Sequence, residues 1–276
     1  MFDAQAILIV AAVGLAAGVL GGMLGIGGSV LMIPAMVLLF GQGTRDPGFN
    51  QHLYQAAAMI VNLFVIAPAT YRHAKAGAVR TDVLKRLMPA AAAFIFLGVF
   101  ASTLPLFDPQ NTYLGATGPQ WLGRLFAAFL AYVIALNLLR FLRGRRDVEG
   151  DERLATWRIV SIGAAMGFLA GLLGIGGGAL AVPMQQVLLR LPLRQCIANS
   201  AAVICLTAGV GAVAKNLALP PACDPVDALT LAALLAPTAV LGGYLGGSLT
   251  HKLPTAAVRL LFIALLATAG ARMALA

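Results

Sequence analysis

The 276 residues carry a net charge of +9 and a mean hydropathy of +0.90, with 60% hydrophobic and only 11% charged residues. A soluble domain carries about 25% charged residues, and its core could not hide this much apolar surface from water. The composition therefore excludes an ordinary soluble protein and predicts an all-α polytopic membrane protein. The basic residues fall in short segments between apolar runs, so they indicate membrane topology and not a nucleic-acid partner.

Eight apolar stretches follow one another along the chain, separated by polar segments. Most have a length of 18 to 22 residues, which a helix needs to cross roughly 30 Å of hydrocarbon. Continuous apolar runs predict helices, because backbone groups in lipid must be satisfied within the segment. The stretches are Gln5–Phe40, His52–Tyr71, Leu87–Leu104, Trp121–Leu142, Ile159–Leu189, Cys196–Ala214, Leu229–Leu249 and Thr255–Leu275.

The chain contains an internal repeat. GVLGGMLGIGGSVLMIP at residues 18–34 aligns with GFLAGLLGIGGGALAVP at residues 167–183, at a constant offset of 149. Weaker matches follow in the same order, so we predict two homologous repeats of four helical segments. The predicted boundaries are 1–145 for the first transmembrane repeat, 146–158 for a basic cytoplasmic linker and 159–276 for the second repeat.

Two topologies are open. If the long stretches 5–40 and 159–189 each cross the membrane once, the halves are parallel and Lys and Arg divide 13 to 6 between the two sides. If each is a re-entrant hairpin that turns at its glycines, the halves are inverted and the division is 15 to 4. The positive-inside rule favours inversion, with loops 72–86 and 140–158 cytoplasmic. The first arm, about 27 Å of helix, is long for a half-membrane hairpin and counts against it.

The segments LGIGGS at 24–29 and LGIGGG at 173–178 are predicted to break their helices, since each interior glycine costs about 1 kcal/mol relative to alanine. Freed backbone groups survive in lipid only when they are buried in protein or line a cavity. Broken helices at matching positions of two repeats are typical of transporters, and the half-helix N-terminus favours an anion. The predicted substrate-binding residues are Gly25, Ile26, Gly27, Gly28 and Ser29 in the first repeat and Gly174, Ile175, Gly176, Gly177 and Gly178 in the second.

Other glycines recur at every fourth position, and this spacing predicts close helix packing. They are Gly14, Gly18 and Gly22 in the first repeat and Gly163, Gly167 and Gly171 in the second. Pro34 and Pro183 follow the two glycine segments, and we expect them to act as hinges.

A few uncharged polar residues lie inside the apolar stretches. Gln55 and Asn62 are seven residues apart on one face of a helix, Asn199 and Ser200 begin another helix, and Gln185 follows the second glycine segment. Such groups can donate hydrogen bonds to a desolvated oxyanion, so all five are candidate substrate-binding residues. Their alternative role is hydrogen bonding between helices.

Arg124 and Arg259 begin equivalent segments of the two halves. Each is a candidate for the mouth of a pathway, and the alternative is an interfacial arginine whose guanidinium reaches the headgroups. No Asp or Glu lies clearly within a span, and no His, Asp and Glu group has metal-ligand or catalytic spacing. We therefore expect no enzyme, no metal and no cofactor.

The paired segments GIGGSVLMIP and GIGGGALAVP, with YRHAKAGAVRTD at 71–82 and ANSA at 198–201, resemble the TauE/SafE family of sulfite and organosulfonate exporters. The resemblance spans nearly the whole chain. It implies a multi-pass inner-membrane transporter of small sulfur-containing anions such as sulfite, sulfoacetate or related organosulfonates, and we expect alternating access.

The two halves depart from each other in ways that affect this expectation. Ser29 stands where the second half has Gly178, and QAAA at 55–58 stands where the second half has ANSA, so the halves are expected to contribute unequally. A passive anion channel and a transporter of a small carboxylate remain the alternatives. GxxxG faces also permit a homodimer.

Overall fold

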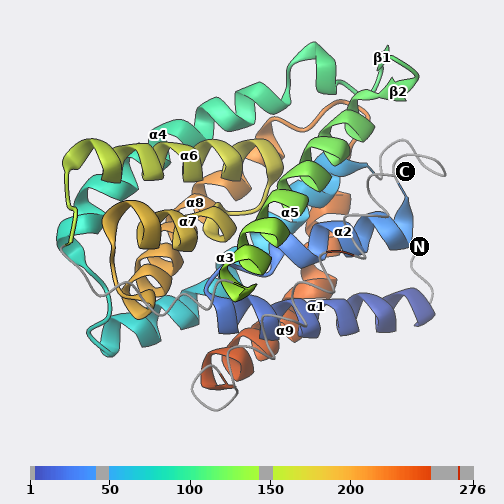
Figure 1. Cartoon of the computed structure of the whole chain (residues 1–276). Helices are drawn as coiled ribbons and strands as arrows, with labels where there is room; N and C mark the ends of the chain where they lie inside the picture. The colour runs from blue at the N-terminus through green and yellow to red at the C-terminus, as the bar shows by residue number, and fades with distance from the viewer. Residues whose placement is uncertain (1–3, 42–49, 143–151, 250–266, 268–276) are drawn as a thin grey trace.

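A computed structural model describes residues 4–41, 50–142, 152–249 and 267, and almost all of these residues are helical (Figure 1). The helices are α1 (Ala4–Leu24), α2 (Ser29–Phe40), α3 (Gln51–Lys75), α4 (Thr81–Ser102), α5 (Gly118–Leu142), α6 (Thr156–Leu173), α7 (Gly178–Met184), α8 (Leu193–Leu217) and α9 (Pro225–Leu249). Among the described residues, 6 helices are long and apolar enough to cross a membrane. The predicted class, an all-α polytopic membrane protein, is confirmed.

Both long apolar stretches are broken at their glycines. The helix that precedes each break ends at Leu24 or Leu173, and the next begins at Ser29 or Gly178. The left-handed backbone conformation, which glycine adopts without a steric penalty, recurs through both breaks. It is found at Gly25 (φ 63°), Gly27 (φ 79°), Gly174 (φ 71°), Gly176 (φ 68°) and Gly177 (φ 80°). The predicted helix breaks are therefore confirmed.

The chain folds back on itself at each break. A Cβ atom added to Gly28 would lie 3.3 Å from the carbonyl oxygen of Ala17, and one added to Gly177 would lie 2.6 Å from that of Met166. These two contacts are equivalent under the repeat offset. The returning arms are α2 and α7 with its π-helical continuation η2 (Gln185–Leu189). Each arm is about 18 Å long, too short to cross the hydrocarbon layer.

The two halves interlock through their helix pairs. The most extensive pairs are α4 with α6 and α1 with α9, followed by α3 with α8 and α3 with α9. Figure 1 shows α4 beside α6 at the top and α1 beside α9 at the bottom. In the repeat alignment α1 corresponds to α6 and α4 to α9, so each half packs its first helix against the third long helix of the other. The halves thus form one packed unit around α3 and α8.

The glycines at every fourth position lie in these helix interfaces. A Cβ atom added to Gly18 would lie 2.9 Å from the carbonyl carbon of Ala239 in α9, and one added to Gly167 would lie 2.8 Å from that of Ala91 in α4. Such separations are shorter than real Cβ contacts, so the helix backbones approach as closely as glycine allows. The predicted packing role is confirmed for all six glycines, each of which faces the partner helix in this way.

Some boundaries and connections differ from the sequence prediction. Helix α4 begins at Thr81, six residues before the predicted start at Leu87, because its first turn is polar and carries Asp82 where the helix dipole favours an acid. The connection to α5 contains a 3-10 turn, η1 (Pro105–Phe107), and a hairpin of β1 (Thr112–Tyr113) and β2 (Ala116–Thr117), which were not predicted. Of the predicted stretch 255–275, the structure describes only residue 267.

Replacing Gly18 or Gly167 with alanine is expected to destabilise the protein, because each new methyl group forces two helix backbones apart at a cost of about 1–3 kcal/mol. The matched control is Gly209→Ala in α8, where an added Cβ atom would meet nothing closer than 3.7 Å. Thermal melting of the purified variants in detergent measures the difference. Equal melting midpoints for Gly18→Ala and Gly209→Ala would contradict the packing assignment.

Candidate functional site

The two glycine loops meet inside the bundle. A Cβ atom added to Gly178 would lie 2.8 Å from the Cα atom of Ile26, so the start of α7 touches the first loop directly. All ten loop residues predicted to bind substrate, 25–29 and 174–178, are buried. The structure thus brings the two predicted loops together.

Asn62 of α3 lies between these loops. A Cβ atom added to Gly27 would lie 2.8 Å from the amide nitrogen Nδ2 of Asn62, and one added to Gly176 would lie 2.6 Å from the same atom. Oδ1 of Asn62 accepts a hydrogen bond of 2.9 Å from the backbone N–H of Gly28. The residue is 0% exposed, and Nδ2 has no hydrogen-bond partner among the described residues. The oxygen of the Asn62 amide therefore holds the first loop, and its nitrogen is a buried donor without a partner among the described residues.

Two further predicted residues have unpaired polar atoms. Both amide atoms of Gln55 and the hydroxyl oxygen of Ser29 are buried without a partner in the described part of the chain. A Cβ atom added to Gly174 would lie 2.6 Å from Cβ of Gln55, so Gln55 packs directly on the second loop. Gln55 precedes Asn62 by seven residues, which is about 10 Å along the same helix face. Leaving a buried polar group unpaired costs about 1–3 kcal/mol, so such a cluster calls for a partner.

The contacts that α8 makes with the two loops are mainly apolar. An added Cβ atom on Gly25 would lie 3.5 Å from Cβ of Ile197, and one on Gly176 would lie 3.0 Å from Cγ2 of Ile204. Helix α3 thus presents amides where α8 presents isoleucines. The polar contact from α8 is the hydroxyl of Thr207, which lies 2.9 Å from the carbonyl oxygen of Gly176 and holds the second loop.

Three other predicted residues are engaged with one another. The backbone N–H of Arg80 donates to Oδ1 of Asn199 at 2.8 Å, and Nδ2 of Asn199 donates to Oε1 of Gln185 at 3.1 Å. Nε2 of Gln185 in turn donates to the hydroxyl of Ser200 at 3.0 Å. Asn199 precedes Thr207 by eight residues, or about 12 Å along α8. These hydrogen bonds fit the alternative role, bonding between segments, and substrate binding by Gln185, Asn199 and Ser200 stays a prediction.

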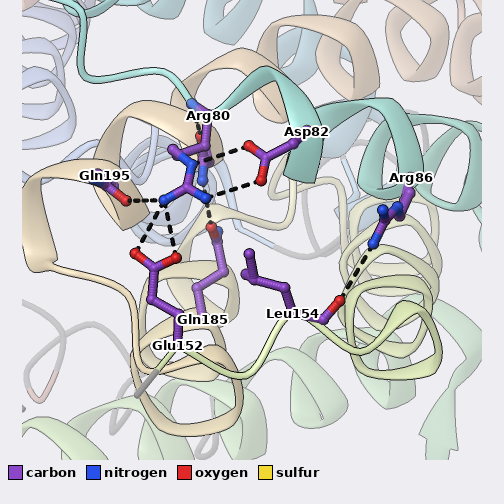
Figure 2. Close-up of polar contacts among 8 residues, drawn as sticks. Arg80, Asp82, Arg86, Glu152, Leu154, Gln185 and Gln195 are labelled. Atoms are coloured by element: carbon purple, nitrogen blue, oxygen red, sulfur yellow. Dashed lines mark hydrogen bonds and ion pairs between the residues drawn. The ribbon is translucent and has the colours of Figure 1, made fainter. Parts of the chain in front are cut away.

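The Arg80 side chain extends this network (Figure 2). Its guanidinium contacts Asp82 at 2.9 Å and Glu152 at 3.0 Å, and it donates to Oε1 of Gln195 at 3.4 Å. The hydrogen bonds to Asp82 and then to Glu152 raise the pKa of Arg80 above its ordinary value, so the guanidinium stays charged. Arg80 therefore joins the loop before α4, the segment before α6 and the start of α8. We refer to Arg80, Asn199 and Gln185 with these partners as the Arg80 network.

The remaining predicted residues have the following places. Pro34 is buried within α2, and Pro183 lies within α7 just before the helix becomes π-helical. The Arg124 guanidinium lies 5.0 Å from the ring centre of Trp121, an arrangement that suits an interfacial arginine. Arg259 lies outside the described residues. The hinge and pathway-mouth roles stay predictions.

Lys215 was not predicted as a site residue, although it is buried. Its side chain is 2% exposed, and Nζ donates a hydrogen bond of 2.6 Å to the hydroxyl of Ser102 at the end of α4. The sequence prediction ended the helix at Ala214 and assigned Lys215 to a loop. The available signal was that no other charged residue occurs within 203–219.

Membrane-length helices, together with two glycine breaks whose loops are buried, define a multi-pass membrane protein of the transporter class. The profile of the family described as "Sulfite exporter TauE/SafE" matches residues 10–273. The chain belongs to the sulfite exporter TauE/SafE family, as the resemblance in the sequence indicated.

Curated relatives have transporter names. The chain is 28% identical over 292 residues to "Probable membrane transporter protein MamO" of Magnetospirillum gryphiswaldense. The aligned region covers 94% of this chain and 43% of that protein. The chain is also 22% identical over 278 residues to "Probable membrane transporter protein YunE" of Bacillus subtilis. That alignment covers 96% of both proteins. The chain thus spans less than half the length of MamO. No solved structure matches the chain.

Replacing Asn199 with alanine is expected to lower the free energy of unfolding by about 2 kcal/mol or more. The substitution leaves the backbone N–H of Arg80 and the side-chain oxygen Oε1 of Gln185 without their partner. Arg80→Gln is the comparison, because its ion pairs are partly exposed and contribute about 1 kcal/mol at most. Thermal melting in detergent distinguishes the two effects. If Asn199→Ala is no less stable than Arg80→Gln, the assignment of Asn199 to a structural network is wrong.

Proposed function

We propose that the protein is a secondary transporter that moves small sulfur-containing anions, such as sulfite, sulfoacetate or related organosulfonates, across the inner membrane. The observation that carries the proposal is the unpaired amide nitrogen of Asn62, buried between Gly27 and Gly176. An oxyanion can accept the hydrogen bond that this nitrogen does not make with the described residues. Uncharged donors suit transport, because they bind a desolvated anion without the strong attraction of a buried cation.

The side chains of α3 and α8 that contact the loops support a substrate with a charged head group and a short apolar body. Gln55 and Asn62 supply amide donors from α3, whereas Ile197 and Ile204 face the loops from α8. A sulfonate or carboxylate group would lie against the amides, and a methylene group against the isoleucines. Sulfoacetate carries both kinds of group, and the family description supports sulfur oxyanions.

The burial of the site supports alternating access. Ser29, Gln55 and Asn62 are each 0% exposed, so a substrate can reach them only when packed elements separate. The Arg80 network closes one end of the bundle with contacts between the two halves and their linker. Rocking one repeat against the other would open this end, and Pro34 and Pro183 are placed to let the short arms α2 and α7 bend.

The inverted arrangement of the repeats is part of the proposal. The helix hairpins at both glycine breaks support it. With α6 as a hairpin arm, the membrane-length helices left are α3, α4 and α5 in the first half and α8 and α9 in the second, and the predicted stretch 255–275 would be the sixth crossing. With the basic loops 72–86 and 140–158 in the cytoplasm, the Arg80 network lies at the cytoplasmic end. The repeats would be 1–145 and 159–276, with 146–158 as the linker.

Replacing Gly176 with leucine is expected to abolish transport, because the side chain would occupy the position of the Asn62 amide and would strain a residue with φ 68°. Counterflow of labelled sulfoacetate in proteoliposomes measures the loss, and Gly209→Ala is the control that retains transport. Insertion is checked by the elution profile of the detergent-solubilised variant. Wild-type counterflow in a correctly inserted Gly176→Leu protein would contradict the central site, and wild-type flux without counterflow would indicate a channel.

Single cysteines at positions 75 and 224 are expected to react from opposite sides of the membrane if the repeats are inverted. Both parent residues, Lys75 and Asp224, are exposed at helix ends. The variants Lys75→Cys and Asp224→Cys are made in a protein whose three native cysteines are replaced by serine. Labelling of intact and opened vesicles with an impermeant maleimide measures sidedness. Labelling of both cysteines from the same side would support the parallel arrangement instead.

A further inference from the structure

We infer that Lys215, Ser102 and His52 form a second binding site for a small oxyanion, at the end of α3 and α8 opposite the Arg80 network. The identity of the oxyanion as the transported substrate rests on the proposed function, whereas binding itself does not. The central site around Asn62 uses uncharged donors, so a site built on a lysine is chemically different from it.

The three residues come from three helices that end at the same place. Lys215 lies in the last turn of α8, Ser102 is the last residue of α4, and His52 is in the first turn of α3. Lys215 and His52 are each 2% exposed, Ser102 is 1% exposed, and His52 contacts the carbonyl of Phe107, which follows Ser102 closely in the chain. Along α3, His52 precedes Asn62 by ten residues, or about 15 Å. The second site therefore lies between the central site and one end of the bundle.

The ammonium of Lys215 has fewer partners than its chemistry requires. It carries three N–H groups, and the hydrogen bond to Ser102 is the only one it makes with the described residues. Both ion pairs found among those residues belong to Arg80, so no described carboxylate neutralises Lys215. A cation buried in a membrane bundle is costly unless an anion or several acceptors pair with it. A bound oxyanion would supply that charge.

The neighbouring polar groups position the ammonium, and its N–H groups are the donors left for an anion, because Ser102 and His52 donate their own protons to carbonyl oxygens. The Ser102 hydroxyl accepts from Lys215 and donates to the carbonyl of Val99 at 2.6 Å, which fixes the ammonium in place. Nε2 of His52 is 2.8 Å from the carbonyl oxygen of Phe107 and must carry the proton of this bond, because a carbonyl only accepts. The imidazole orientation is thereby set. The site has a fixed cation and a restrained ring, and it is closed to bulky headgroups by its burial.

The test is calorimetric titration of sulfoacetate into the purified full chain in nanodiscs. The wild type is expected to show two sites, and Lys215→Met and Asn62→Leu are each expected to show one. The double variant is expected to show none. Lys85→Met, which removes an exposed lysine, is the control that keeps both sites.

The outcomes separate this inference from the proposed function. Two unchanged sites in Lys215→Met would overturn the inference. A single wild-type site that is lost in Asn62→Leu and retained in Lys215→Met would also overturn it while supporting the central site. A single site that shows the reverse pattern would support the Lys215 site and contradict the central one.

A second variant covers the case in which Lys215→Met does not fold. Ser102→Ala keeps the ammonium but removes the hydroxyl that positions it, so we expect sulfoacetate affinity at one of the two sites to fall about tenfold. The other site should be unchanged. Equal affinities at both sites in Ser102→Ala and wild type would overturn the inference.

Discussion

The need to satisfy backbone and amide groups inside an apolar bundle governs this structure. A continuous helix pairs its own N–H and C=O groups, but the two glycine breaks interrupt that pairing deep in the protein. Asn62 and Thr207 compensate in part, one by accepting from the N–H of Gly28 and the other by donating to the carbonyl of Gly176. The Asn62 amide nitrogen has no hydrogen-bond partner among the described residues, and the proposed anion site is built on this donor.

Helix packing holds the two breaks together. The first helix of each half packs closely against the other half at its glycines, as at Gly18 against Ala239 and Gly167 against Ala91. Because the two interfaces are equivalent under the repeat, the loops that follow these helices are brought into contact. The central helices then differ, since α3 presents Asn62 where α8 presents Ile204. A symmetric scaffold thus carries an asymmetric site.

Much of this arrangement was predictable from local sequence. The contiguous glycines at 25–28 and 174–178 indicate helix breaks by their backbone cost, and the four-residue spacing of Gly14, Gly18 and Gly22 indicates packing. Among the polar candidates, the composition of a segment could not tell which side chains find partners. Asn62 and Asn199 are both amides within apolar helices, yet Asn199 accepts from the Arg80 backbone, whereas the Asn62 nitrogen has no partner in the described part of the chain.

Two helix boundaries depend on side-chain contacts that hydropathy does not reveal. Helix α8 extends past Ala214 because Lys215 finds Ser102, a residue 113 positions away in sequence. The polar first turn of α4 is helical because Arg80 and Asp82 pair at its start, which a hydropathy criterion does not detect. The Lys215–Ser102 contact joins segments distant in the chain, so no local pattern carries it, whereas the Arg80–Asp82 pair is local.

The most direct test of the account is a structure of the protein with a heavy-atom substrate analogue. Bromoethanesulfonate combines a sulfonate with a bromine whose anomalous scattering marks its position. We expect a peak between the two glycine loops, with a sulfonate oxygen within hydrogen-bond distance of the amide nitrogen of Asn62. A bound analogue located elsewhere, with that nitrogen bonded to protein, would contradict it.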